Sequence, residues 1–227
     1  MLNLFKKQKI NRYVSFTFDD GFINSAKKIH NIIYPNKATF YIVSKWLNRD
    51  FTDIKDKFNI GADHGDIKQW KQISEYGHEI GSHTMSHVGP DTDDFSEYLE
   101  SLNFIRNFGS GPYSLAMPYG LKSSSQMPYD SVRLCNGKNS YNLLENINFS
   151  ELISFDPFEG GLMMEDVMLE LNKMPSDCWL IIRAHGLDNE GYCPWPSKYF
   201  KKIYELLLME EFNIKTVREM TLKLINK

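Results

Sequence analysis

The chain has 227 residues and a formal net charge of −3, which gives no reason to expect a general affinity for nucleic acid. No apolar run reaches the length of a membrane span, and the basic start, 1–12, lacks the apolar segment of a secretory signal. With 42% hydrophobic residues, the chain can bury one core, and we expect a basic N-terminal arm, 1–12, before a single domain, 13–227. Three cysteines without a CxxC spacing argue against a disulfide framework and favour a reducing, cytoplasmic location.

Strand and helix patterns alternate along nearly the whole chain. Runs of β-branched and aromatic residues predict strands at 14–18, 38–43, 79–82, 114–117, 151–155, 178–182 and 213–217, with 131–135 as a further candidate. Apolar residues at helical spacing predict helices between Gly21 and Pro35 and at 67–76, about 95–105, 162–174, 199–209 and 218–225. A long polar loop is expected at 48–65, and 121–148 shows no clear pattern.

This alternation predicts a parallel sheet, open or closed, with helices outside it. In such folds the chemistry gathers at the carboxyl ends of the strands. The notable polar residues all follow predicted strands: Asp19 and Asp20, His83 and His87, Tyr119, Asp156, and His185. The sequence therefore predicts a functional site at that edge of the sheet.

The first strand runs directly into two adjacent carboxylates, Asp19 and Asp20. Adjacent carboxylates repel each other when they are withdrawn from water, so they need a nearby cation, and a metal ion is the usual solution. Only one of the two needs to bind the metal. Because consecutive strand residues point in different directions, the other carboxylate is available to act as a base.

Two further metal ligands are available from the segment after the third strand. His83 and His87 are four residues apart, a spacing that on a helical turn places both imidazoles on one face. Two histidines and one carboxylate leave positions for water and substrate, which is typical of a catalytic metal site. His185 follows the most apolar strand and is a candidate general acid. The same ligand set also occurs in iron oxygenases, usually on all-β folds, and we keep that class as an alternative.

The ordered motifs resemble those of a known family. Thr17-Phe18-Asp19-Asp20-Gly21, then 77–87 with His83 and His87, then Pro118-Tyr119-Gly120, and finally Ile181 to Gly186 are similar to motifs of the polysaccharide deacetylases, the NodB-homology family or carbohydrate esterase family 4. The resemblance spans roughly Tyr13 to Glu219. It implies a distorted seven-stranded β/α barrel and metal-dependent hydrolysis of an acetamido group on a sugar.

The resemblance also implies roles for individual residues. Asp19 matches the catalytic base, and His185 matches the general acid. The backbone N–H of Tyr119 matches the donor that stabilises the oxyanion. The remaining matches, Asp20, His83 and His87, are the ligands of one divalent metal, usually zinc.

The chain departs from the family pattern near the catalytic base. Family members often carry an arginine three residues before the tyrosine, paired with the base, but this chain has Ala116 there. Arg133 and Arg183 are the candidates to replace it. Asp156 occupies a plausible place for the aspartate that orients the catalytic histidine, and a turn cap is the alternative interpretation.

Two residues are candidates for substrate binding. Trp195, between two prolines on the loop after His185, could stack on a sugar ring, and His64 could line the cleft or lie in an exposed turn. The leading hypothesis is a hydrolase that removes an acetyl or formyl group from an N-acylated sugar or oligosaccharide. A carbohydrate-binding homologue with impaired catalysis is the non-enzymatic alternative. It is prompted by Ala116 and by the lack of a clear Asp-Trp motif, whose aspartate orients the catalytic histidine in the family.

Overall fold

The computed structural model describes residues 11–47, 62–90, 94–135, 141–158, 161 and 164–226. Its strands are β1 Arg12–Phe18, β2 Thr39–Ile42, β3 Glu79–Ser82, β4 Ser114–Ala116, β5 Ser131–Cys135, β6 Tyr141–Leu143, β7 Leu152–Ser154, β8 Cys178–Ala184 and β9 Asn213–Ile214. Its α-helices are α1 Ile23–Ile33, α2 Ile67–Glu75, α3 Ser96–Ile105, α4 Met164–Lys173, α5 Ser197–Met209 and α6 Val217–Ile225. Most predicted elements are therefore present, with ends shifted by a few residues.

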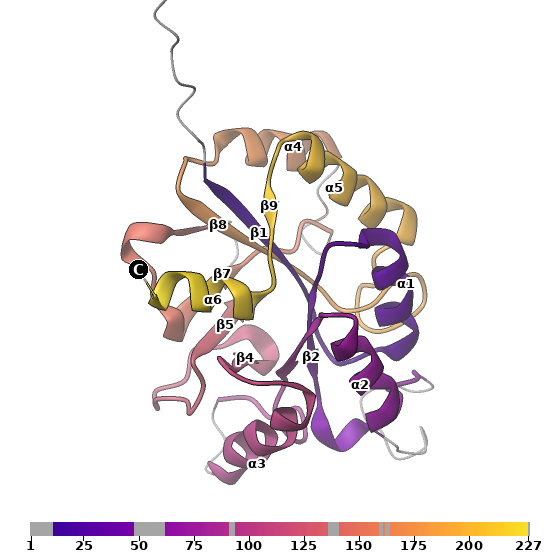
Figure 1. Ribbon diagram of the computed structural model, residues 1–227, viewed down its shortest axis with the longest axis vertical. Coiled ribbons are helices and arrows are strands. Elements are labelled where there is room, and N and C mark those ends of the chain that lie inside the picture. The colour runs from indigo at the N-terminus through magenta and orange to yellow at the C-terminus, as the bar shows by residue number, and fades with distance from the viewer. Residues whose placement is uncertain are drawn as a thin grey trace, which may run out of the picture.

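Seven parallel strands wrap into a nearly closed barrel, which confirms the predicted fold class. Their order is β8-β1-β2-β3-β4-β5-β7. Phe155, just past β7, bridges the remaining gap, because its N–H donates to Ile181 and its carbonyl accepts from Arg183, at 2.9 and 2.8 Å. Figure 1 shows α1, α2 and α5 on the outside of these strands.

The strand β6 was not predicted, because the stretch 121–148 has no periodic pattern. It runs antiparallel to β8 and lies between β8 and β7 on the side of the barrel where those two strands diverge. The side chain of Asn142 bonds the backbone of Ile153 in β7 at 2.9 Å, and that of Trp179 in β8 at 3.2 Å. The carboxamide therefore supplies backbone partners where direct strand pairing is interrupted.

The two faces of β1 explain how the sequence encodes the barrel. Val14, Phe16 and Phe18 alternate along the strand and pack outward with residues of α1 and α5 in the main apolar core. The residues between them point inward, where Ser15 accepts a hydrogen bond from the indole N–H of Trp179 at 2.9 Å. A strand buried on both faces carries its polar groups toward the barrel axis.

A buried carboxylate closes the amino-terminal end of the barrel. Glu79 accepts hydrogen bonds from the hydroxyls of Thr39 and Ser114 and from the backbone N–H of Arg218, at 2.8, 2.5 and 2.7 Å. Arg218 lies in the first turn of α6, so the carboxylate sits at the positive end of that helix. Figure 1 shows α6 crossing in front of the strands at this end. The predicted strand 213–217 is shorter than expected because Thr216 caps α6 instead.

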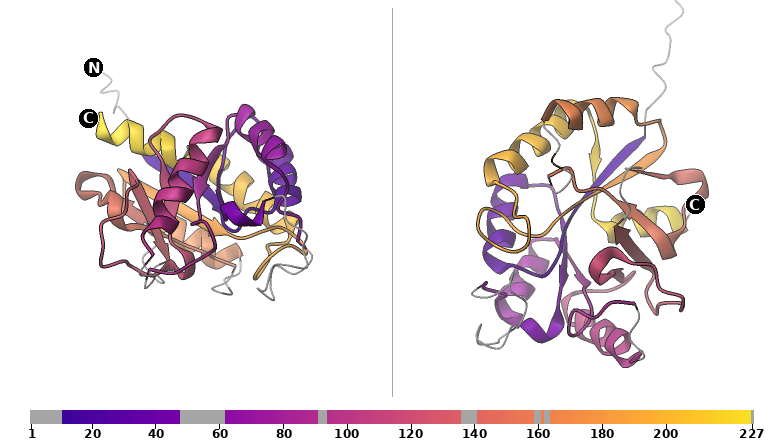
Figure 2. Two further views of the ribbon diagram at one scale, coloured as in Figure 1. Left: turned by 90° about the horizontal axis from the view of Figure 1, so that it is seen from below. Right: turned by 180° about the vertical axis from the view of Figure 1, so that it is seen from behind.

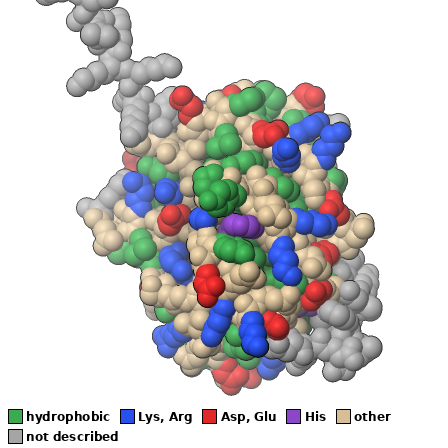
Figure 3. All heavy atoms as spheres, turned by 45° about the vertical axis from the view of Figure 1, so that its right-hand side comes forward, with side chains coloured by type: hydrophobic (Ala, Val, Ile, Leu, Met, Phe, Trp, Pro, Cys, Tyr) green, Lys and Arg blue, Asp and Glu red, His purple; other side chains and the backbone are tan. Residues whose placement is uncertain are grey.

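Several predictions fall on residues outside the described ranges, namely most of the N-terminal arm and of the loop 48–65. Arg12 itself lies in β1, one residue before the predicted start of the domain. None of the described helices combines the length and the apolar character needed to cross a bilayer. Figure 3 shows basic and acidic side chains interspersed over one face of the molecule.

We predict that Glu79→Ala lowers the free energy of unfolding by about 2–4 kcal/mol, because three buried donors lose their acceptor. Urea unfolding measures this change. The exposed Glu75 at the end of α2 provides the matched control, and Glu75→Ala should change stability by less than about 0.5 kcal/mol. Equal stability of the two variants would contradict a role for Glu79 in closing the barrel.

Candidate active site

The candidate site lies at the carboxyl ends of β1, β3, β4, β5 and β8, opposite the end that α6 covers. Figure 2 turns this end toward the viewer in its right-hand view. Asp19 follows β1 and still donates its backbone N–H to Ala184 at 3.0 Å. The chain then turns sharply, with φ of 69° at Asp20 and 78° at Gly21. A Cβ on Gly21 would lie 2.9 Å from the Ile42 side chain, so both the conformation and the space require glycine there.

Asp20, His83 and His87 converge as a group that could hold a metal ion. Their ligand atoms all lie within 4.8 Å of one another. The Nε2 atoms of His83 and His87 are each 3.5 Å from Oδ1 of Asp20. Ligands bound about 2.1 Å from a tetrahedral metal lie roughly 3.4 Å apart, so this spacing fits a zinc-sized cation.

Neighbouring groups prepare His83 for such a role. Its Nδ1 lies 2.8 Å from the carbonyl oxygen of Ala116, so the proton belongs on Nδ1 and the lone pair on Nε2 faces Asp20. Burial is the main reason why the pKa of His83 falls to about 3, and the imidazole is therefore neutral at physiological pH. A neutral imidazole with Nε2 directed into the site is what a metal ligand requires.

The histidine segment is a loop and not the helical turn that the spacing suggested. Thr84 and His87 have positive φ angles of 66° and 62°. Glu97 on α3 holds the loop by accepting from the backbone N–H and the hydroxyl of Ser86, at 2.9 and 2.7 Å. The imidazoles thus converge through loop geometry, which the spacing alone could not distinguish from a helix.

A buried ion pair fixes Asp19. Arg133 on β5 places Nη2 2.5 Å from Oδ2 of Asp19, and both side chains are almost fully buried. Burial by itself raises the pKa of Asp19, but the charge of Arg133, aided by nearby imidazole and guanidinium groups, lowers it to about 2. Oδ1 of Asp19 makes no hydrogen bond within the described part of the chain. The carboxylate is therefore charged, and Arg133 holds one of its two oxygens.

Arg133 supplies the guanidinium for Asp19 that Ala116 cannot supply. Ala116 in β4 and Arg133 in β5 are partners in the parallel register, and register partners point to the same face of a sheet. Either position can therefore deliver a guanidinium to the barrel interior. Arg183, the other candidate, instead faces Asp156, with Nη2 3.9 Å from Oδ2.

Tyr119 and His185 also lie at this end of the barrel. Tyr119 has a strained φ of 61° for a non-glycine residue and is 68% exposed, with its ring 5.0 Å from that of His87. His185 directly follows β8 and is half-buried, with its ring 5.6 Å from that of Tyr192. The structure thus brings Tyr119, His185 and Asp19 to one end of the barrel.

Both predicted substrate-binding residues are buried. Trp195 is 0% exposed and donates its indole N–H to Asp156 at 3.1 Å, so the prediction that it stacks on a sugar is wrong. Two prolines suggested an exposed loop, but the ring packs into the main core. His64 is buried, so the alternative of an exposed turn is wrong, whereas a place in the cleft wall stays a prediction. Its Nδ1 lies 3.1 Å from the carbonyl oxygens of Asp20 and Gly21, so the imidazole supports the turn after β1.

Trp46 and Tyr192 also border the site, although neither is a predicted site residue. The Trp46 ring lies 5.3 Å from that of His87 and 5.0 Å from that of His64. Trp46 follows β2, as Asp20 follows β1 and the two histidines follow β3, and this position was the only sequence signal for it. An aromatic residue after a strand is more often part of the core, so the signal was weak.

A family model described as polysaccharide deacetylase matches residues 6–127, more than half of the chain. The chain belongs to the polysaccharide deacetylase family. The matched segment includes Asp19, Asp20 and Tyr119 together with both histidines of the loop. It ends before Arg133 and His185, whose places in the site therefore follow from the structure.

Solved structures with the same architecture include three relatives of different activity. A peptidoglycan N-acetylglucosamine deacetylase is 20% identical, with a TM-score of 0.57 over 91% of this chain and 86% of its own. A family 4 acetyl xylan esterase from Clostridium thermocellum, solved with a cobalt ion, is 18% identical, with a TM-score of 0.55 over 91% and 88%. A family 4 pseudoenzyme from Bacillus anthracis is 16% identical, with a TM-score of 0.55 over 93% and 66%. At these identities the likeness establishes the fold. No curated protein sequence matches the chain significantly.

We predict that Arg133→Ala destabilises the protein by about 3 kcal/mol or more, because the Asp19 carboxylate stays buried without its cation. Adding Ala116→Arg should recover a large part of this loss, since residue 116 can deliver a guanidinium to the same space. Thermal and urea unfolding of both variants and of Ala116→Arg alone measure the effect. A double variant no more stable than Arg133→Ala would show that the two positions are not equivalent.

Proposed function

We propose that the protein is a metal-dependent hydrolase that removes an N-acetyl or N-formyl group from an amino sugar or glycoconjugate. The main support for this proposal is the position of Asp19 next to a possible metal-binding group. The charged carboxylate of Asp19, held by Arg133, lies beside the group of Asp20, His83 and His87. A base next to a metal-binding group is the arrangement that water activation needs, and membership of the deacetylase family supports a carbohydrate amide as substrate.

Asp20, His83 and His87 would hold one divalent metal, for which we propose zinc. One carboxylate and two neutral imidazoles suit zinc, and they also suit other divalent transition metals. When bound, the metal polarises the amide carbonyl and lowers the pKa of water. The known cobalt complex belongs to the Clostridium thermocellum esterase and not to this chain.

Two of the other residues transfer protons, and a third stabilises the charge that develops on the carbonyl oxygen. Asp19 accepts a proton from the attacking water, and Arg133 keeps it anionic until then. The backbone N–H of Tyr119 donates to the carbonyl oxygen as negative charge develops on it. His185 donates a proton to the leaving nitrogen as the C–N bond breaks, which releases acetate or formate and the free amine. Residues 13–227 would act together as the catalytic domain.

The alternatives receive less support. The residue Ala116 and the lack of a clear Asp-Trp motif prompted the idea of an impaired carbohydrate-binding homologue, and a pseudoenzyme with this fold is known. The ion pair of Arg133 with Asp19 removes the first of these two reasons, because a guanidinium still holds the base. An iron oxygenase is disfavoured by the parallel β/α barrel and by the family to which the chain belongs.

The test of the proposal is release of acetate or formate from a panel of N-acetylated and N-formylated amino sugars and oligosaccharides. We expect turnover that a chelator abolishes and added zinc restores, with no consumption of oxygen. Binding of the sugars without release of acid would favour the impaired homologue. Oxygen consumption with iron would favour the oxygenase.

We predict that Asp19→Asn lowers kcat by about 10²–10⁴-fold while metal binding is retained, because the variant loses the base and keeps Asp20, His83 and His87. Metal content and calorimetric titration measure metal binding. His83→Ala should lose metal and activity together, and Asp130→Asn at an exposed position should change neither. Full activity of Asp19→Asn would remove the role proposed for Asp19.

A further inference from the structure

The helix α1 begins without a cap of its own. The residue before it, Phe22, makes no side-chain capping bond, and its first turn contains no acidic residue. The first N–H groups of a helix have no partner within the helix and need acceptors from elsewhere. Here the N–H of Ile23 donates to the carbonyl of Asp63 at 2.9 Å, and that of Ser25 donates to the side chain of Glu190 at 2.8 Å.

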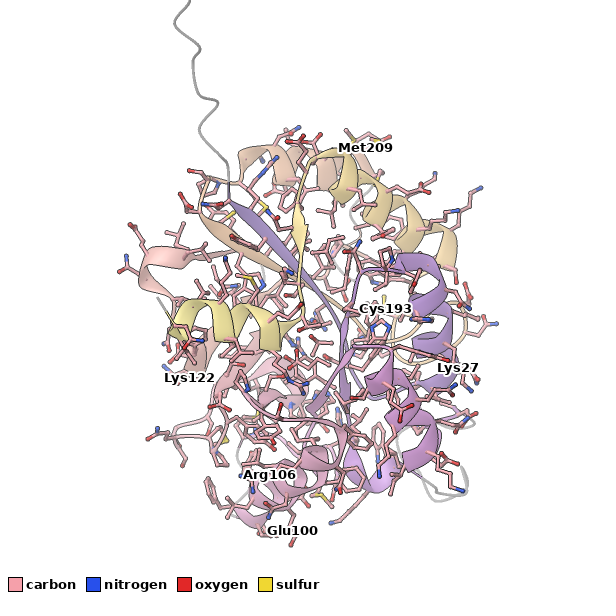
Figure 4. All side chains as sticks on the ribbon, viewed as in Figure 1. Lys27, Glu100, Arg106, Lys122, Cys193 and Met209 are labelled. Carbon is pink, nitrogen blue, oxygen red and sulfur yellow. The ribbon has the colours of Figure 1, made fainter. Side chains whose placement is uncertain are left out.

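Glu190 reaches this helix from the loop 186–196, which connects β8 to α5. Its Oε2 also accepts from the hydroxyl of Ser25 at 2.5 Å, and its Oε1 accepts from the carboxamide of Asn24 at 3.2 Å. The Ser25 hydroxyl in turn accepts from the backbone N–H of Leu187 at 2.8 Å. In Figure 4 the labelled Cys193 of this loop appears against α1. The loop is therefore bound to the first turn of α1 by a carboxylate at the positive end of the helix.

The packing around this contact leaves little room for the loop to shift. Gly191 has a φ of +87°, and a Cβ there would lie 2.5 Å from the Phe22 ring and 3.4 Å from Cβ of His185. An ion pair of Lys28 on α1 with Asp188 on the loop, at 2.7 Å, forms a second link. The loop thus closes against Phe22 immediately beside His185.

Each of the two segments that Glu190 joins carries part of the candidate site. The turn Asp19-Asp20-Gly21 leads directly into Phe22 and α1, while His185 leads directly into the loop. We propose that Glu190 is a positioning residue that sets the place of His185 relative to Asp19 and Asp20. This inference rests on the proposed function, in which His185 is the general acid.

Glu190→Ala should lower kcat about 10–100-fold with KM changed less than about threefold, since a small displacement of a catalytic group costs rate more than binding. Metal affinity should stay as in the wild type. Glu190→Gln keeps an acceptor oxygen without the charge, so its kcat should lie between those of Glu190→Ala and the wild type. Glu205→Ala, at an exposed site on α5, is the matched control and should behave as the wild type.

A double-mutant cycle separates positioning from general destabilisation. If Glu190 acts through His185, then adding Glu190→Ala to His185→Ala should lower kcat no further. Additive losses in an active enzyme would overturn the inference.

Two readouts do not depend on turnover. In Glu190→Ala the Leu187 amide should exchange with solvent about tenfold faster or more, and the NMR resonances of the His185 ring should shift, both unlike Glu205→Ala. Unchanged exchange and unchanged ring resonances would overturn the inference. A wild-type protein that releases no acid from any substrate would instead overturn the proposed function, while these two measurements would still decide the role of Glu190.

Discussion

Two adjacent carboxylates buried at the end of β1 are the constraint on which the site depends. Asp19 and Asp20 are both less than 5% exposed, and neither could stay charged there without compensation. Arg133 compensates Asp19 from inside the barrel, whereas Asp20 faces two imidazoles. This difference in partners gives two neighbouring residues of one type different chemistry, and it is the physical basis for assigning one as base and the other as ligand.

The barrel interior is built to hold charge at both ends. Glu79 at the amino-terminal end is satisfied by two hydroxyls and the first turn of α6, and the pair of Asp19 with Arg133 lies at the other end. Small polar side chains such as Ser154, which accepts from Arg133 at 3.1 Å, complete these networks. A charge inside a narrow barrel is stable only where such partners are already in place, so the interior networks and the site depend on each other.

The loops that carry the site are held by carboxylates from neighbouring elements. Glu97 on α3 holds the loop of His83 and His87 through Ser86, and Glu190 holds the loop after His185 against α1. Both loops contain residues with positive φ, whose strained backbone needs such support. Candidate catalytic groups on these loops are thus held in place by hydrogen bonds from other elements.

The sequence by itself determined the β/α alternation and the strand ends that carry chemistry. It also placed Asp19 and Asp20 after the first strand and the two histidines after the third. These features could be predicted because periodicity and local motifs are properties of neighbouring residues. Only the tertiary structure decided which arginine pairs with Asp19, since Arg133 lies 114 positions away from it in the sequence and reaches it across the barrel interior. The same holds for Trp195 and His64, whose burial depends on packing between distant segments. β6 and Glu190 were missed for this reason also, because their partners β8 and Ser25 lie far away in sequence.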